Sequence, residues 1–353
     1  RWTIEDIIKR YSNHVAFPIY LTYEEKEYDD KGKEKGSKTK TDRINAGTAI
    51  WRQAKSELKE EDYHEFYKQI AHDTEDPLFY VHTKAEGTLE YVTLFYIPKK
   101  APFDLYHADY KPGVKLYVKR VFITDDDKEL MPTYLRFVRG VIDSEDLPLN
   151  VSREILQQNR ILQNIRNASV KKLLSEFKAL ADNNKEKWET FISQFNRPLK
   201  EGLYQDFANR ETLQELVRFK STAVAGWTSF ADYVSRMKSD QKAIYYITGG
   251  DEKTLKASPL LEAYKAKGIE VLVMDDEIDD IVIPSLFKYK DYELKAVNRA
   301  GADEELGDQK DKDAEKDLQP VIEKLKKALG DRVKDVKLSR RLQDSPSCIV
   351  ADE

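Results

Sequence analysis

The stretch SEDLPLNVSREILQQNRIL, residues 144–162, decides how this sequence is interpreted. An acidic turn and a proline lead the chain to Ser152, whose hydroxyl is a favourable helix N-cap. Apolar side chains then recur close to helical spacing, and this pattern predicts a long helix over about 152–182. We therefore expect an acidic turn and a proline that deliver the chain into a long, capped helix.

Arg153 falls in the first turn of that expected helix. A cation is disfavoured there, because the N-terminal end of a helix already carries partial positive charge. An arginine in this place suits an anionic ligand, which makes Arg153 a candidate functional residue. The alternative is a structural ion pair with Asp143, Glu145 or Asp146, and the residues alone leave both interpretations open.

Before this run, the sequence alternates between helical and strand patterns. Its charged, glycine-broken stretch at 24–43 predicts a solvated hairpin or loop. Strands rich in Val, Ile, Tyr and Phe are expected at 17–23, 88–97 and 114–123. Helices are expected at 4–11, 60–71 and 133–142.

After the long helix, helical segments continue through 186–238, and the pattern then changes. A strand, a helix and a second strand form a compact βαβ unit, in which parallel strands favour a right-handed crossover. Its expected elements are a strand at 243–248, a helix at 252–267 and a strand at 269–274. A polar linker at 298–317, a helix at 315–329 and a strand at 333–342 follow.

The 353 residues are enough for two or three domains. We expect a mixed α/β (α+β) fold built from α-β-α units. Its expected parts are a large α-β-α sandwich at 1–200, a helical connector (coil) at 201–240, a small α-β-α unit at 241–297, a linker at 298–312 and a truncated α/β C-terminal module at 313–353.

Composition excludes several classes of partner. Lys+Arg total 59 against 64 Asp+Glu, and the net charge of −5 argues against nucleic acid, whose phosphates need clustered cations. No apolar run approaches about 18 residues, so we expect no membrane partner. The single cysteine, Cys348, excludes an internal disulfide framework and fits a reducing cytoplasm.

No self-sufficient active site is visible. The five histidines lack metal-ligand spacing, so we expect no metal site. The segment GKEKGSKT at 32–39 resembles a phosphate-binding loop, but its glycines are one residue too close and its Lys and Ser are transposed. The segment IYYITGG at 244–250 ends a strand at two glycines but lacks the spacing of a dinucleotide site.

The run at 144–162 resembles the signature of the middle domain of the ninety-kilodalton heat-shock chaperone family. Its sequence is most similar to the bacterial branch of that family. Further segments similar to that family occur in the same order along essentially the whole chain. They are IPKKAPFDLY at 97–106, VKLYVKRVFITDD at 114–126, LRFVRGVIDSEDLPLN at 135–150, ADYVSRM at 231–237, AIYYITG at 243–249 and SPLLEAYKAKGIEVL at 258–272.

The resemblance implies a role for Arg153 and two of its neighbours. In that family the arginine of this run reaches the γ-phosphate of ATP bound in a preceding domain. Asn150 and Gln157 match positions that help fix the catalytic loop and contact the nucleotide side. A guanidinium suits phosphate because it is planar, permanently charged and able to bond two oxygens.

The resemblance also implies two protein-binding surfaces. Trp51 matches an exposed tryptophan that holds partly folded client protein, and its polar surroundings favour exposure; the alternative is burial against the nearby helix. Phe122 and Leu147 match a patch on which the N-terminal domain docks, with ordinary core as the alternative for both.

Because the chain opens at Arg1 and ends at Glu353, we expect a segment of a longer, cytoplasmic chaperone. ATP and Mg²⁺ would be bound by an absent N-terminal domain, and absent C-terminal helices would form the homodimer. The segment alone would then neither hydrolyse ATP nor dimerise stably. The alternatives are a passive client-binding scaffold and a small-molecule α/β enzyme built on the unit at 243–274.

Overall fold

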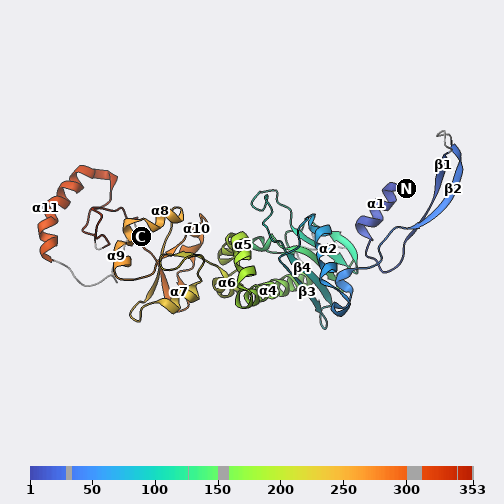
Figure 1. Cartoon of the computed structure of the whole chain (residues 1–353), viewed down its shortest axis with the longest axis horizontal. Coiled ribbons are helices and arrows are strands. Elements are labelled where there is room, and N and C mark those ends of the chain that lie inside the picture. The colour runs from blue at the N-terminus through green and yellow to red at the C-terminus, as the bar shows by residue number, and fades with distance from the viewer. Residues whose placement is uncertain (29–33, 126, 150–158, 300–311, 340, 352–353) are drawn as a thin grey trace. The chain divides into compact units, whose positions relative to one another are not determined.

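The computed structural model describes residues 1–28, 34–125, 127–149, 159–299, 312–339 and 341–351. The chain divides into two compact units, Arg1–Pro198 and Leu199–Glu353. Both units combine helices with a sheet (Figure 1), and each of these sheets has five strands. The predicted mixed α/β fold is therefore confirmed.

The first unit is built around the sheet β3-β4-β7-β5-β6. Only β5 and β7 pair in parallel, whereas the other neighbours are antiparallel. A separate two-stranded hairpin, β1-β2, precedes this sheet. The strands are β1 (Tyr20–Tyr28), β2 (Glu34–Arg43), β3 (Phe79–Ala85), β4 (Tyr91–Ile97), β5 (Gly113–Val118), β6 (Val121–Thr124) and β7 (Arg139–Ser144).

Helices cover both faces of that sheet. One face packs against α2 (Glu60–Ala71) and the short 3-10 helix η1 (Ile50–Arg52) through a cluster rich in aromatic rings. On the other face, rings from β3 and from the segment before β7 contact rings of α4 (Arg160–Asn183) and α5 (Lys185–Gln205). These layers form the predicted α-β-α sandwich.

The remaining helical elements of the first unit are short or stand at its N-terminal end. They are α1 (Trp2–Tyr11) and the 3-10 helices η2 (Lys55–Glu57) and η3 (Thr133–Leu135). The ring of Tyr11 in α1 lies 5.8 Å from that of Phe122 in β6, so α1 packs near the β6 edge of the sheet.

The second unit has the sheet order β11-β12-β9-β10-β8, with β12, β9 and β10 parallel. The predicted βαβ unit is confirmed, because the chain passes from β9 through α8 and α9 to its parallel neighbour β10. The strands are β8 (Lys220–Ser221), β9 (Ala243–Ile247), β10 (Leu272–Val273), β11 (Lys288–Tyr289) and β12 (Tyr292–Ala296).

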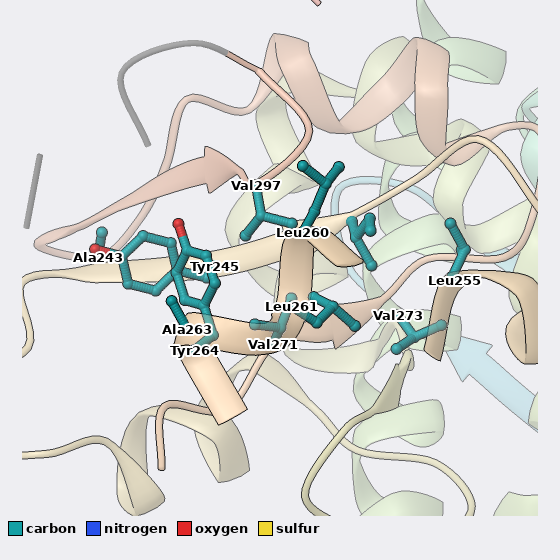
Figure 2. Packing of buried hydrophobic residues seen from close by; sticks show 11 residues of the cluster. Ala243, Tyr245, Leu255, Leu260, Leu261, Ala263, Tyr264, Val271, Val273 and Val297 are labelled. Atoms are coloured by element: carbon teal, nitrogen blue, oxygen red, sulfur yellow. The ribbon is translucent and has the colours of Figure 1, made fainter. Parts of the chain in front are cut away.

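The crossover segment covers the central strands of this second sheet. Figure 2 shows Tyr245 of β9 beside Tyr264, with Leu261 near Val271, and together they fill the core of the unit. The helical elements are η4 (Phe207–Asn209), α6 (Arg210–Leu216), α7 (Phe230–Arg236), α8 (Glu252–Lys256), η5 (Pro259–Leu261), α9 (Glu262–Ala266), α10 (Asp279–Val282), η6 (Ile283–Ser285), α11 (Lys312–Leu329) and η8 (Gly330–Arg332).

The last described segment also packs onto the second unit. The guanidinium of Arg341 donates to the carbonyls of Val297 and Arg299, at 2.9 and 2.7 Å. The Glu262 carboxylate accepts the backbone N–H groups of residues 343–345. These bonds lower the pKa of that carboxyl to about 2. Residues beyond α11 thus contribute to the unit formed by β8–β12.

Several expected elements are wrong. The single strand expected at 114–123 is the hairpin β5-β6. Within 133–142, where a short helix is expected, only the 3-10 turn at 133–135 is helical, and residues 139–142 belong to strand β7. The helix expected at 252–267 is split at Ser258-Pro259, where proline begins a new 3-10 turn. No strand occupies the described part of 333–342.

The start of the long helix also differs from the expectation. Helix α4 begins at Arg160, where the Asn159 side chain accepts N–H groups from Ile161 and Leu162. An asparagine in extended conformation satisfies the free donors of the first turn, so Asn159 is the cap of α4. The cap predicted at Ser152, and Arg153 beside it, lie outside the described residues.

Gly140 in β7 gives a test of the sheet packing. Its φ is +140°, and a Cβ built there would lie 2.1 Å from the carbonyl oxygen of Leu94 in β4. Gly140→Ala should therefore lower the free energy of unfolding by at least about 3 kcal/mol, measured by urea denaturation. Gly87→Ala is the matched control, since φ is +130° but nothing lies within 4 Å. Equal losses in the two variants would contradict the packing argument.

Candidate functional site

Trp51 lies at the centre of a buried polar network in the first unit. Its side chain is 1% exposed, and its indole N–H donates to the Asp143 carboxylate at 2.8 Å. Its ring packs against His14, Phe66 and Tyr117, with centroids 4.7–5.5 Å apart. Such tilted and edge contacts between aromatic rings stabilise a core beyond simple area burial.

The expectation that Trp51 is exposed is therefore wrong. The polar residues around it in the sequence suggested a solvated loop, but η1 turns the indole inward. The nearest polar partner is Asp143, 92 residues away, and a buried indole N–H needs such an acceptor. In this structure Trp51 offers no surface to a client protein.

His82 holds the backbone of the same tryptophan. Its Nε2 lies 2.9 Å from the Trp51 carbonyl oxygen, and its Nδ1 lies 2.9 Å from the Tyr63 hydroxyl. Burial lowers the pKa of His82, which favours the neutral ring. A neutral imidazole that donates from Nε2 to the carbonyl accepts the Tyr63 hydroxyl proton at Nδ1. Side chain and backbone of Trp51 are thus both fixed.

Asp143 is the anion around which this network is organised. It is fully buried at the end of β7, and its Oδ2 accepts from Trp51 and from Nε of Arg52, the latter at 2.7 Å. Its Oδ1 accepts the backbone N–H of Arg120 at 3.1 Å. A buried carboxylate is tolerable only when its charge is paired and its oxygens are bonded, and both conditions are met.

The carboxylates of the acidic turn after β7 also have bonding partners. Glu145 lies 2.8 Å from Nη1 of Arg52, and Asp146 accepts the backbone N–H of Glu90 at 2.6 Å. Together with Asp143, these are the three carboxylates that the structural interpretation of Arg153 would use. Each already has a described partner elsewhere.

The two expected docking residues lie in the same unit and are buried. Phe122 is 8% exposed and contacts Tyr117 in the core cluster, while Leu147 is 1% exposed. The Phe122 ring also lines a cavity of about 240 Å³ with His14 and Lys115. Neither side chain presents a large apolar surface by itself. Their docking role stays a prediction.

The expected catalytic residues Arg153, Asn150 and Gln157 lie outside the described residues. The described chain stops at Leu149 and resumes at Asn159. The sequence did not point to Arg52 and His82, which bond to Asp143, to Glu145 and to the backbone of Trp51. A local signal for them is lacking, because their partners lie between 19 and 93 residues away.

Over the ranges that the structure describes, no group of three or more His, Cys, Asp or Glu side chains is placed to hold a metal ion. Within the same ranges, every helix is too short or too polar to cross a bilayer.

Comparison with known proteins identifies the family. The family model described as Hsp90 protein matches residues 22–353. The chain belongs to the Hsp90 family. The predicted resemblance is confirmed by close relatives named chaperone protein HtpG. Those from Treponema denticola and Treponema pallidum are 71% and 62% identical to this chain over its whole length.

The chain spans 56% of the length of these two relatives. Among solved structures, the middle domain of a heat shock protein from Plasmodium falciparum is 38% identical, with a TM-score of 0.65. It covers 71% of this chain, and all of that domain is matched. The Hsp90 middle-domain fold expected from residues 97–272 is thus confirmed.

The burial of Trp51 gives a direct test. Trp51→Ala should lower the free energy of unfolding by about 3–5 kcal/mol, because it leaves a cavity and removes a donor from buried Asp143. Trp2 is 70% exposed, and Trp2→Ala is the matched control with an expected change within about 0.5 kcal/mol. Denaturant unfolding of both variants measures the difference. A Trp51 variant as stable as the control would contradict the buried network.

Proposed function

We propose that this chain is a segment of an ATP-driven chaperone that binds partly folded proteins and supplies Arg153 to the γ-phosphate of ATP. ATP and its Mg²⁺ would be bound by a part of the whole protein outside this chain. Membership of the Hsp90 family and the chaperone names of its relatives support this proposal. Hydrolysis would then require two domains to meet, which couples ATP turnover to remodelling of the client. The whole protein would act in the cytoplasm as a homodimer.

The observation that supports a catalytic role for Arg153 is that the nearby carboxylates already bond to other groups. Asp143, Glu145 and Asp146 all bond to other described groups, so they are less suited to neutralise this arginine. A guanidinium is suited to an incoming phosphate, to which it can donate two parallel hydrogen bonds. Asn150 and Gln157 would support the same contact from either side of Arg153.

The ATP-binding domain would dock over the surface above Phe122 and Leu147. Because both side chains are almost fully buried, they would shape that surface from beneath. The contact would come from the backbone and from the more exposed neighbours of these residues. Docking in this place would bring the ATP-binding domain to the same end of β7 from which residues 145–149 depart.

Client binding needs exposed apolar surface, and Trp51 does not provide it here. In the second unit, Ile281 of α10 is 65% exposed and Phe287 is 77% exposed. Phe287 also has a φ of +57°, an unfavourable backbone conformation for a bulky residue. A strained residue that exposes an aromatic ring is a candidate for binding, since strain of this kind clusters at functional positions. We place a client contact at Phe287.

The catalytic proposal predicts the behaviour of Arg153→Ala in the full-length protein. Removing the guanidinium should slow ATP hydrolysis at least about tenfold, because developing phosphate charge loses a donor. ATP affinity should stay within about twofold of the unchanged protein, as the adenine would be held in another domain. Steady-state turnover and calorimetric ATP binding measure the two effects. Arg153→Lys should restore little, and unchanged turnover in the alanine variant would refute the catalytic role.

The client proposal predicts that Phe287→Gly weakens client binding and leaves stability nearly unchanged. Loss of an interface aromatic should weaken binding of a partly unfolded protein by about 1–4 kcal/mol. Stability should change by less than about 1 kcal/mol, because relief of the positive φ offsets the flexibility of glycine. Fluorescence titration with a destabilised client and thermal melting measure these effects. Phe103→Ala removes an even more exposed ring, 93% exposed, from the first unit as a control; equal losses of binding would contradict a specific contact at Phe287.

A further inference from the structure

A cavity of about 240 Å³ in the first unit is lined by residues of α1, of the segment after it, of α2 and of the β5-β6 hairpin. Its wall carries four side chains that are cationic or become so on protonation, namely Lys9, Arg10, His14 and Lys115. Among the described residues, Asp125 is the one carboxylate on this wall. In a chain whose net charge is −5, a hollow lined in this way attracts anions locally.

Lys115 occupies a position in β5 where an apolar side chain would pack well. It precedes Tyr117 by two residues, and both side chains line the cavity on the face of the sheet that α2 covers. Burial lowers the pKa of the Lys115 ammonium. Asp125 is the one described group whose charge raises that pKa, and no hydrogen bond contributes. The ammonium is therefore partly removed from water without a close partner in the described chain, and a bound anion would offset that cost.

His14 and Asn13 add hydrogen-bonding groups to the same wall, and both are half-buried. The Nδ1 of His14 lies 2.8 Å from the Thr48 carbonyl oxygen, which can only accept, so Nδ1 carries the proton in this bond. The Nε2 of His14 makes no hydrogen bond within the described chain, which leaves it for a ligand. The Oδ1 of Asn13 accepts the backbone N–H of Ala46 at 2.9 Å, so its amide nitrogen remains as a donor.

Aromatic rings form the apolar part of the cavity wall. Phe66, Tyr117 and Phe122 all line it, and the ring centroids of the last two are 5.7 Å apart. Sites for small molecules commonly combine such an apolar wall with a few polar groups that fix the orientation of the ligand. Because sites for drug-sized molecules enclose about 300–1,000 Å³, this smaller cavity suits a ligand with one ring and cannot enclose a whole nucleotide.

We infer that this cavity binds a small organic anion, a phosphate ester or carboxylate that carries one ring. The ring packs on the aromatic wall, and the anionic group contacts Lys115 and His14. Lys9 and Arg10 are exposed on α1. They draw the anion toward the cavity but contribute less to its affinity, because water screens exposed charges. The inference is independent of ATP and of Arg153, since every residue in it belongs to the described part of the first unit.

The test is isothermal titration calorimetry of this protein with phenyl phosphate as the probe. A ligand of so few atoms should bind with a dissociation constant in the millimolar range. Inorganic phosphate lacks the ring and phenol lacks the charge, so each should bind at least about tenfold more weakly. The absence of binding heat at millimolar phenyl phosphate would overturn the inference. Inorganic phosphate that binds as tightly as phenyl phosphate would do the same.

Lys115→Met separates a specific site from general attraction of anions. It removes the charge and nearly keeps the length of the side chain, and it should weaken phenyl phosphate binding at least about tenfold, because a charge-assisted hydrogen bond is lost. Lys111→Met is the matched control, since Lys111 is an exposed lysine just before β5 and outside the cavity wall. Its affinity should stay within about twofold. Equal losses in the two variants would refute a site at Lys115.

Thermal melting distinguishes loss of the site from loss of the fold. Lys115→Met should melt no lower than the unchanged protein, because an apolar group replaces a half-buried ammonium. His14→Asn covers the case in which Lys115→Met fails to fold. An asparagine can still donate to the Thr48 carbonyl oxygen but lacks the second ring nitrogen, so phenyl phosphate binding should fall several-fold. Unchanged affinity in folded His14→Asn would rule out the inferred contact.

Discussion

The buried carboxylate of Asp143 is the group on which the arrangement around β7 depends. It bonds the indole N–H of Trp51, the guanidinium of Arg52 and the backbone N–H of Arg120, so one anion in β7 joins η1 and the β5-β6 turn. A charge removed from water is costly unless every oxygen is bonded, and this cost makes alternative placements of those segments unfavourable. The carboxylate thus contributes specificity as much as stability.

The same constraint explains the β5-β6 hairpin. Lys119 and Arg120 both have positive φ angles, which are normally favourable only for glycine, asparagine or aspartate. Their backbone N–H groups donate to the Ser144 carbonyl oxygen and to the Asp143 carboxylate, both from the end of β7. Tertiary hydrogen bonds offset the local strain.

An element of this fold could be predicted from the sequence where the residues that determine it are close together in the chain. The bounds of α2 agree with the helix expected at 60–71, and the parallel pair β9-β10 agrees with the expected βαβ unit. Both could be predicted because hydrophobic periodicity and glycine at the end of a helix are patterns of residues that are close in sequence. Strand β7 was missed, since burial on both faces removes the alternating pattern. The exposure of Trp51 was misjudged, because its polar neighbours in sequence include Arg52, which is itself held by a buried acid.

By itself the sequence determined the family, the α/β class and the run that contains Arg153, since ordered motifs and helical periodicity are properties of neighbouring residues. Tertiary structure alone decided that Trp51 is core, that α4 begins at Arg160, and that Arg52 links Asp143 to Glu145. The contacts of Trp51 and Arg52 with Asp143 join residues about 90 positions apart. Their energies depend on desolvation and geometry in the folded chain, which no local pattern of residues encodes.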